Sequence, residues 1–200
     1  LAAEPKLAYP ILDLAFLPSM PFCRIYLDLT HILAIAVVYG DINVIKTIIE
    51  QGADINFQGD NSITAILCAV ATDDINKVKT LIEIGKKQSN NNVVYPVNVN
   101  VITSGYPKDF TPLSLAVGQF NLQIMELLLQ NGATDSELFL NSAFELAIKI
   151  GFEKGTILLL QYGADPTNYF SNEVVQNWVK NYILATVNNK DVTAALVCLR

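Results

Sequence analysis

A short phrase recurs along this chain and constrains its fold more than any single residue does. In each copy, Gly and Ala follow a block of apolar residues at helical spacing and precede a small polar or acidic residue. The three copies are Gly52-Ala53-Asp54, Gly132-Ala133-Thr134 and Gly163-Ala164-Asp165. A phrase that returns after every apolar block indicates a chain built from repeated units.

A second motif precedes each apolar block and sets the length of the unit. Its clearest copy begins at Thr111, and the other copies begin at His31, Thr64 and Ser142. These starts lie 33, 47 and 31 residues apart along the chain. A period near 33 with one interruption predicts a solenoid of helix pairs, in which no unit can bury its apolar face alone.

Taken in phase, these motifs resemble the ankyrin repeat family, whose units open with Thr-Pro-Leu-His and close with Leu-Leu and Gly-Ala-Asp. The third copy matches best, with Thr111-Pro112-Leu113, Leu127-Leu128-Leu129 and Gly132-Ala133. The resemblance implies an all-α ankyrin-repeat solenoid of stacked helix pairs with short β-turn loops and one long insertion. The expected segments are an irregular apolar N-terminal cap at 1–28, four repeats at about 29–58, 59–86, 106–135 and 137–166, an insertion at 87–105, and a degenerate fifth repeat or C-terminal cap at 167–200.

The chain departs from the family pattern at two positions of the repeat. The family's Gly between the two helices survives as Gly40 and Gly151, whereas Asp73 and Phe120 stand there in the second and third units. The family's His, which usually hydrogen-bonds across to the neighbouring unit, is absent from all four. Without this histidine, we expect the contact between neighbouring repeats to be less rigid. We still expect the ankyrin-repeat fold. The residues in its place are Ala34, Leu67, Ser114 and Glu145.

Signals for helix ends agree with this division. Thr64 and Thr111 are placed to cap first helices by accepting a backbone N–H, and Pro112 suits a first helical turn because the donor it lacks would be unpaired there. Glycine is expected to end the second helices, because a left-handed conformation costs it little. The glycines predicted to do so are Gly52, Gly85, Gly132 and Gly163.

The segment from Lys86 to Phe110 interrupts the period and differs in chemistry from the repeats. Lys86 to Asn92 is polar and turn-prone, and Val93 to Val101 alternates in part between apolar and polar residues, as an extended hairpin arm does. Two interpretations stay open. The segment is either a tolerated surface insertion, since long loops add little closure entropy, or an arm that contacts a partner.

Both ends of the chain are less regular than its centre. Residues 1–28 contain four prolines and many large apolar residues, so we expect them to cap the first repeat or to dock on another domain. Residues 178–200 look like a degenerate fifth helix pair. Because the chain begins at Leu1 and ends on an apolar helix, we expect a processed or excerpted chain with more protein after Arg200.

Composition excludes several classes of partner. The chain is 52% apolar, but its longest apolar run, Ile32 to Tyr39, is about half of what a membrane-spanning helix needs. A net charge of −6 with thirteen scattered Lys and Arg residues argues against nucleic-acid binding, which needs a concentrated basic face. Three distant cysteines, Cys23, Cys68 and Cys198, favour a reducing compartment, and we expect a cytoplasmic chain.

The sequence offers little that could perform chemistry. His31 is the only histidine and has no Cys or carboxylate at ligand spacing nearby, so a metal site is not expected. Asp73-Asp74 falls at an inter-helix turn. We expect these residues to form a solvent-exposed helix start and not a pair for acid–base catalysis. Cys68 falls on an apolar helix row and is expected to pack. With no Gly-rich phosphate loop and no Ser nucleophile motif, we expect no catalytic residue and no cofactor.

The resemblance implies binding instead, because ankyrin repeats recognise proteins with a concave surface of loop tips and exposed first-helix residues. Tyr39, Phe110 and Phe139 would be its anchors, since aromatic residues carry most interface energy, and Lys108 and Lys149 would meet an acidic partner segment. The alternative is ordinary surface at every position, or packing between repeats for Phe139 and Ile150. The candidate partner-binding residues are Val38, Tyr39, Asp60, Asn61, Ile63, Ala71, Thr72, Pro107, Lys108, Phe110, Gln119, Phe139, Asn141, Lys149 and Ile150.

Two functions are compatible with these expectations. The first is a monomeric, non-enzymatic protein-interaction module in the cytoplasm that binds one partner protein through the concave surface, with the 86–110 arm as a second contact. The alternative is the recognition domain of a larger microbial effector enzyme that acts in a host cytosol and whose catalytic domain lies outside this chain. Abundant Asn, Ile and Lys are a weak sign of an AT-rich genome, as in intracellular bacteria and large viruses.

Overall fold

The structure is a computed structural model in which six segments of the chain are described. These are residues 29–59, 62–88, 96–103, 110–134, 143–169 and 171–186. Every regular element in them is helical, and they contain no strand. The all-α class and the stacking of helix pairs, both predicted from the sequence, are confirmed. The chain divides into two compact units, residues 1–103 (unit 1) and 104–200 (unit 2).

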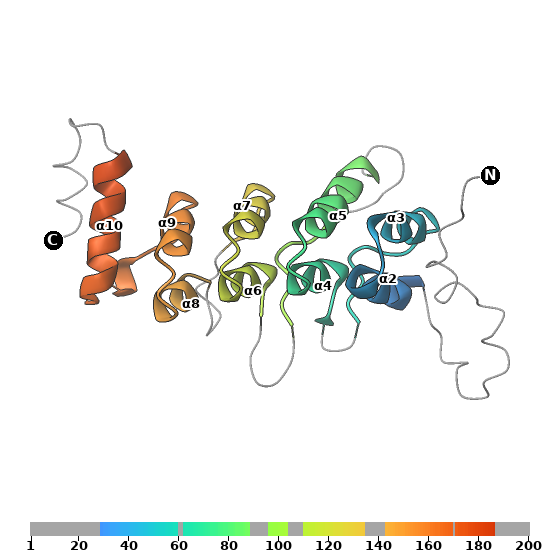
Figure 1. The fold of residues 1–200 in the computed structure, drawn as a ribbon, viewed down its shortest axis with the longest axis horizontal. Coiled ribbons are helices and arrows are strands. Elements are labelled where there is room, and N and C mark those ends of the chain that lie inside the picture. Colours follow the sequence, from blue (N-terminus) through green and yellow to red (C-terminus); the bar gives the residue numbers. More distant parts are fainter. Residues whose placement is uncertain are drawn as a thin grey trace. The chain divides into compact units, whose positions relative to one another are not determined.

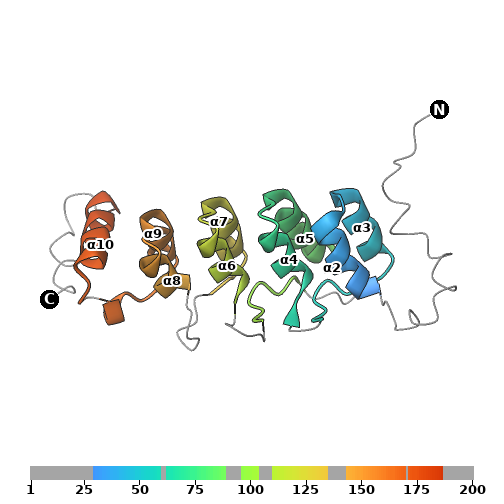
Figure 2. The ribbon, with the colours of Figure 1, turned by 60° about the horizontal axis from the view of Figure 1, so that its bottom comes forward.

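The described residues of unit 1 form two helix pairs (Figures 1 and 2). The first pair is α2 (Leu29–Tyr39) and α3 (Ile42–Glu50), and the second is α4 (Ala65–Ala71) and α5 (Ile75–Gln88). The pairs stack in register, because α2 packs against α4 and α3 packs against α5. The largest side chains that are almost completely buried in this unit are Leu33, Val37, Ile45, Ile48, Ile49, Ile66 and Leu81.

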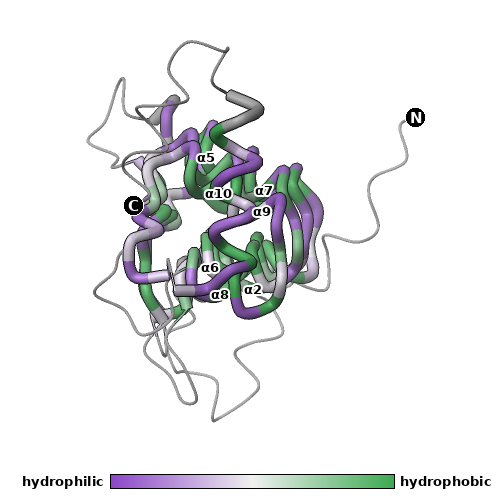
Figure 3. The backbone as a smooth tube through the Cα atoms, turned by 90° about the vertical axis from the view of Figure 1, so that its left-hand side faces the viewer, coloured by the Kyte–Doolittle hydropathy of each residue, from purple (hydrophilic) through white to green (hydrophobic). Residues whose placement is uncertain are grey.

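Unit 2 repeats this arrangement. Helices α6 (Pro112–Gly118) and α7 (Leu122–Gln130) form one pair, and α8 (Ala143–Lys149) and α9 (Glu153–Gln161) form the next. Here α6 packs against α8 and α7 against α9. In Figure 3 the helices carry green apolar stretches that alternate with purple polar ones, as expected for helices that bury one side. The largest buried side chains are Leu113, Ile124, Met125, Leu128 and Leu159.

One long helix follows the fourth pair. After the short 3-10 helix η3 (Thr167–Tyr169), α10 (Glu173–Thr186) packs against α9. Its Trp178 lies 31 residues after Ala147, at the position where all four repeats have a completely buried alanine. Trp178 is half-buried, and the buried apolar residues of α10 are Val175 and Val179. The alanines are Ala36, Ala69, Ala116 and Ala147.

Polar caps begin the first helices where the sequence predicts them. The Thr111 Oγ1 accepts a hydrogen bond from the Ser114 backbone N–H at 3.0 Å, and the Ser114 Oγ accepts one from the Thr111 N–H at 2.9 Å. This reciprocal pair is a capping box, with Pro112 in the first turn. The Thr64 Oγ1 accepts a longer bond, 3.5 Å, from the Leu67 N–H. Both predicted caps are confirmed.

Glycine ends three of the four second helices as predicted. Gly52, Gly132 and Gly163 all have a positive φ just after α3, α7 and α9. The prediction for Gly85 is wrong, because α5 continues through it to Gln88. Gly85 serves close packing instead: a Cβ at this position would lie 2.9 Å from the Val97 Cγ2 and 3.0 Å from the Val97 N.

Residues 97–100 form the closing turn of the second repeat. The Asn98 Oδ1 accepts a bond from the Asn100 N–H at 3.0 Å, as the Asp54 Oδ1 does from the Asn56 N–H at 2.9 Å. Asn56 joins the two turns, since its Nδ2 donates to the Pro96 carbonyl at 3.0 Å and its Oδ1 accepts from the Asn98 N–H at 2.8 Å. The predicted hairpin arm is therefore wrong for residues 96–101, and residues 93–95 lie outside the described residues.

A lysine links the two helix pairs of unit 1. The Lys77 Nζ, on α5, donates to the carbonyl oxygens of Val37 at 2.8 Å and Val38 at 3.4 Å, in the last turn of α2. These carbonyls have no partner within their own helix, and a cation is favourable at the negative end of the helix dipole. This bond supplies a polar tie between neighbouring repeats that lack the family's His.

We expect Thr111→Ala to lower the free energy of unfolding by about 1 kcal/mol, because the first turn of α6 loses a cap. The measurement is the urea midpoint followed by circular dichroism. Thr47→Ala is the matched control, since the Thr47 hydroxyl only donates within α3 to the Asn43 carbonyl and is not a cap. Equal losses in both variants would contradict the capping role.

We expect Lys77→Met to lower the stability of the chain by about 1 kcal/mol, because two carbonyls at the end of α2 lose their donor. Lys79→Met serves as the control, since Lys79 pairs only with Glu83 at 3.9 Å and both side chains are exposed. Thermal and urea unfolding of both variants would check this. A Lys77→Met protein as stable as Lys79→Met would show that the tie contributes nothing.

Candidate functional site

From Ile32 to its end at Tyr39, helix α2 is apolar on all sides, although a helix of this kind is normally buried all round. Leu33, Ala36 and Val37 on one side are buried in the core. The opposite side presents three large apolar side chains at i, i+3 and i+4 spacing. They are Ile35, Val38 and Tyr39, which are 43%, 36% and 81% exposed.

The neighbouring helix α4 adds to this exposed surface. Ala71, which lies in register with Val38, is exposed, and Ile63, just before the cap of α4, is 42% exposed. Thr72 is half-buried, and its hydroxyl donates to the Ala69 carbonyl at 2.8 Å. We define the apolar face of unit 1 as Ile35, Val38, Tyr39, Ile63 and Ala71. Exposed apolar side chains that gather in this way mark interaction sites.

Cys68 lies on α4 between these residues and is half-buried. Burial raises the pKa of its thiol, and a backbone hydrogen bond offsets part of that rise. A thiol with a raised pKa stays protonated at neutral pH and is a poor nucleophile. Its chemistry therefore supports the packing role expected from the sequence.

Carboxylates occupy the turn that follows each first helix of unit 1. The Asp41 Oδ1 accepts bonds of 2.8 and 3.0 Å from two backbone N–H groups in the first turn of α3. The Asp74 Oδ1 caps α5 in the same way, at 2.9 and 3.3 Å. Asp73 is exposed and has a φ of 56°. We define these three residues as the acidic edge of unit 1.

The candidate residues of unit 2 are less exposed than those of unit 1. Lys149, at the end of α8, is exposed, whereas Phe110, Gln119 and Ile150 are half-buried. The predicted aromatic anchor Phe110 therefore presents only part of its ring to solvent. Lys149 is the described candidate of this unit that is open to a partner.

An aromatic pair lies at the inter-helix turns of unit 2. Phe120, between α6 and α7, is 55% exposed and has a φ of 57°. Its ring meets Phe152 edge-on, with centroids 5.0 Å apart and an interplanar angle of 60°. The Phe152 ring also lies on Gly155, where a Cβ would collide with it. Phe120 is thus a strained, exposed aromatic held by a neighbour, which is a frequent property of functional positions.

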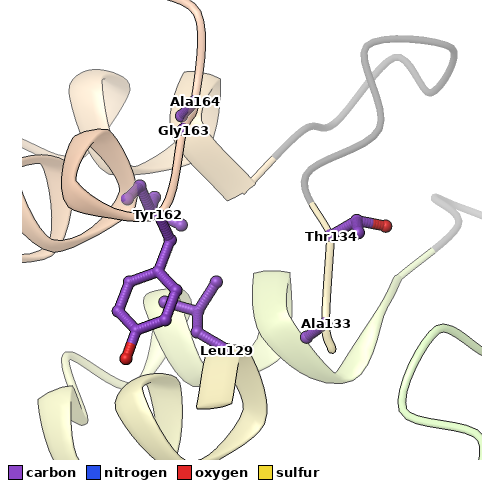
Figure 4. Close-up of a pocket in the computed structure, with 7 residues that line it drawn as sticks. Leu129, Ala133, Thr134, Tyr162, Gly163 and Ala164 are labelled. Carbon is purple, nitrogen blue, oxygen red and sulfur yellow. The ribbon is translucent and has the colours of Figure 1, made fainter. Parts of the chain in front are cut away.

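A shallow pocket of about 180 Å³ lies at the ends of α7 and α9 (Figure 4). The Tyr162 ring stands beside Leu129 there, and Thr134 faces the pocket from the closing turn. Ligand sites usually enclose about 300 Å³ or more and hold several convergent polar groups. This pocket is smaller and has no charged residue in its lining, so it is a weak candidate for a ligand site.

The structure places nine of the candidate binding residues in the part of the chain that it describes. In unit 1, Val38 and Tyr39 lie at the end of α2, Ala71 and Thr72 lie at the end of the neighbouring α4, and Ile63 lies just before α4. The other four belong to unit 2. Six candidates lie outside the described residues. They are Asp60, Asn61, Pro107, Lys108, Phe139 and Asn141.

Sequence reasoning missed two exposed residues of these surfaces. Ile35 lies four residues before Tyr39, so the two residues share one side of a helix. This spacing could have indicated that Ile35 is exposed together with Tyr39. Phe120 occupies the position of the family's inter-helix Gly, and an aromatic residue where a left-handed conformation is required was the signal there.

Among the described residues, no group of three His, Cys, Asp or Glu side chains could hold a metal ion. None of the helices described is long and apolar enough to cross a membrane.

Comparison with known proteins identifies one family. A family model for ankyrin repeats in three copies matches residues 32–133. A search of curated proteins finds no match. The matched range includes α2 to α7, and with them the apolar face and the acidic edge of unit 1.

We expect Phe120→Gly to be more stable than Phe120→Ala by about 1 kcal/mol, because both lose the contact with Phe152 but only alanine keeps a Cβ in the left-handed region. At Gly118, in the last turn of α6, alanine should instead be more stable than glycine, because a Cβ there would meet no atom within 4 Å. There Gly118→Ala should raise the urea midpoint. Equal midpoints for the two Phe120 variants would show that the turn is unstrained.

Proposed function

Because the chain belongs to the ankyrin repeat family, we propose that it binds a partner protein on the exposed faces of its first helices. Ankyrin repeats are generally protein–protein interaction modules and are typically non-catalytic. The single observation that carries the proposal is the apolar face of unit 1, where α2 exposes three large apolar side chains that its own fold leaves uncovered.

The size and chemistry of the apolar face suit a binding surface. Tyr39 is 81% exposed, and burying an aromatic side chain of this kind contributes about 1.5–3 kcal/mol. Tyr is enriched among residues that dominate interface energy, and Ile35 and Val38 lie next to it on the same helix face. We assign Tyr39 the central anchor of the contact.

The backbone beneath this face is held firmly. Ala36 and Val37 are completely buried on the opposite side of α2, and the carbonyls of Val37 and Val38 are bonded to Lys77 of the neighbouring pair. A surface on a rigid helix loses little conformational entropy when a partner binds. We propose that the apolar face is preorganised for binding.

The remaining candidates extend the proposal to other parts of the chain. In unit 2 we assign Lys149 a contact with an acidic group of the partner, with Phe110, Gln119 and Ile150 at the margin of that contact. The loop-tip candidates Asp60, Asn61, Pro107, Lys108, Phe139 and Asn141 belong to the same proposal. We further propose that the chain acts as an adaptor in the cytoplasm.

The test is affinity capture from a cytosolic lysate with identification by mass spectrometry. We expect a partner that the native chain retains to be lost from Tyr39→Ser, with at least about a tenfold drop in affinity. Tyr162→Ser is the matched control, because Tyr162 is also an exposed tyrosine but lies at the end of a second helix. Circular dichroism should first show both variants folded.

Two results would count against the proposal. Equal capture by the native chain and Tyr39→Ser would move binding away from α2. Loss of the partner from Tyr162→Ser alone would place it at the ends of α7 and α9 instead.

A further inference from the structure

We infer that the segment that docks on unit 1 is apolar along the first helices and carries Lys or Arg at the end that lies over the acidic edge. The inference rests on the proposed function and adds the chemistry of the partner. It follows from the apolar face and the acidic edge being consecutive in the chain, since Tyr39 is followed by Asp41 and Thr72 by Asp73 and Asp74.

The carboxylates of the acidic edge are fixed in position by the fold. Asp41 and Asp74 each accept two bonds from backbone N–H groups at the start of a second helix, which hold the carboxylate at the turn. Asp41 and Asp73 are exposed, so both residues lie at the surface.

The first two lysines after Asp74, Lys77 and Lys79, have partners outside the acidic edge. The Lys77 ammonium is the nearest cation in sequence, and it is bonded to the Val37 and Val38 carbonyls. Lys79 pairs with Glu83 further along α5, and Lys46 lies on the exposed side of α3. The Lys77 ammonium, three residues after Asp74, is therefore engaged by backbone carbonyls at the end of α2.

Unit 2 shows that this charge is not a requirement of the repeat. At the equivalent pairs of positions it has Phe120-Asn121 and Gly151-Phe152, and the nearest carboxylate, Glu153, lies one residue later in the first turn of α9. Asn121 caps α7 there, since its Oδ1 accepts the Ile124 N–H at 2.9 Å. A neutral residue thus performs the capping role, and the acidic edge of unit 1 is a property of that surface.

The two surfaces contribute differently to recognition. An exposed ion pair adds little affinity, so the apolar face supplies most of the binding free energy. Fixed charges mainly raise the association rate and disfavour partners of the same sign. The acidic edge is therefore expected to select among apolar segments and to orient the one that binds.

The test uses a displayed library of random peptides of about 16 residues, selected on the full chain, followed by synthesis and affinity measurement of single peptides. We expect the selected peptides to be enriched in large apolar residues and to carry Lys or Arg grouped at one end. Their affinity should fall at least about tenfold for the double variant Ile35→Ser, Tyr39→Ser.

A charge-neutral variant isolates the acidic edge. Asp41→Asn, Asp73→Asn and Asp74→Asn together keep the caps and the left-handed residue, because Asn serves in both roles. We expect this triple variant to bind the same peptides about threefold to tenfold more weakly at low ionic strength, with the difference shrinking as salt is added. Selection on this variant should still enrich apolar residues but no longer Lys and Arg.

Three results would overturn the inference. Selected peptides that are apolar and neutral or acidic would refute the charge preference and leave the proposed binding face standing. Peptides that bind the Ile35→Ser, Tyr39→Ser variant as well as the native chain would refute both the inference and the proposed function for this face. A dimer in analytical ultracentrifugation that this double variant abolishes would make a second copy of the chain the occupant.

Discussion

Contact between neighbouring helix pairs is the constraint on which the rest of each unit depends. The first helices α4, α6 and α8 are only seven residues long, and isolated helices shorter than about 12 residues are marginal in water. They persist because the neighbouring pair covers them. The alanines at their centres, such as Ala69 and Ala116, are completely buried and let adjacent first helices approach closely.

The chain lacks the family's His and ties its repeats by other means. Ser114, which stands in the place of that His, completes the capping box with Thr111. Lys77 reaches from the second pair to the last turn of α2, and Asn56 joins two successive closing turns. Each is a modest polar interaction, worth about 1 kcal/mol. Together they show how a degenerate repeat keeps its geometry: local polar bonds replace one shared motif, while the apolar layer stays the same.

The sequence predicted the fold where local chemistry decides the structure. Caps, left-handed glycines and apolar spacing are short-range signals, and helices begin after Thr64 and Thr111 as they indicate. The prediction that Gly85 ends a helix was wrong, because α5 continues through it. A glycine there leaves room for Val97, twelve residues later in the chain, to pack closely against the helix. The binding face was predicted only in part for a related reason. Apolar periodicity identifies a core-facing side only where the two sides of a helix differ in polarity, and α2 lacks that difference after His31. The one available signal for Ile35 was its spacing of four residues from Tyr39, and apolar periodicity gave none.

In unit 1, different side chains of the apolar helix α2 contribute to folding and to binding. The core side of α2 is buried almost completely, so the exposed side chains of Ile35 and Tyr39 add little to the stability of the fold. Their replacement should therefore change binding without unfolding the chain. The acidic edge differs, because Asp41 and Asp74 cap helices as well as carry charge. A partner that binds the acidic edge contacts carboxylates that the fold already holds in place. Selection for such a partner therefore requires no further ordering of this surface. Binding strength and charge preference thus arise from different residues of the same two helix pairs and can be altered one at a time.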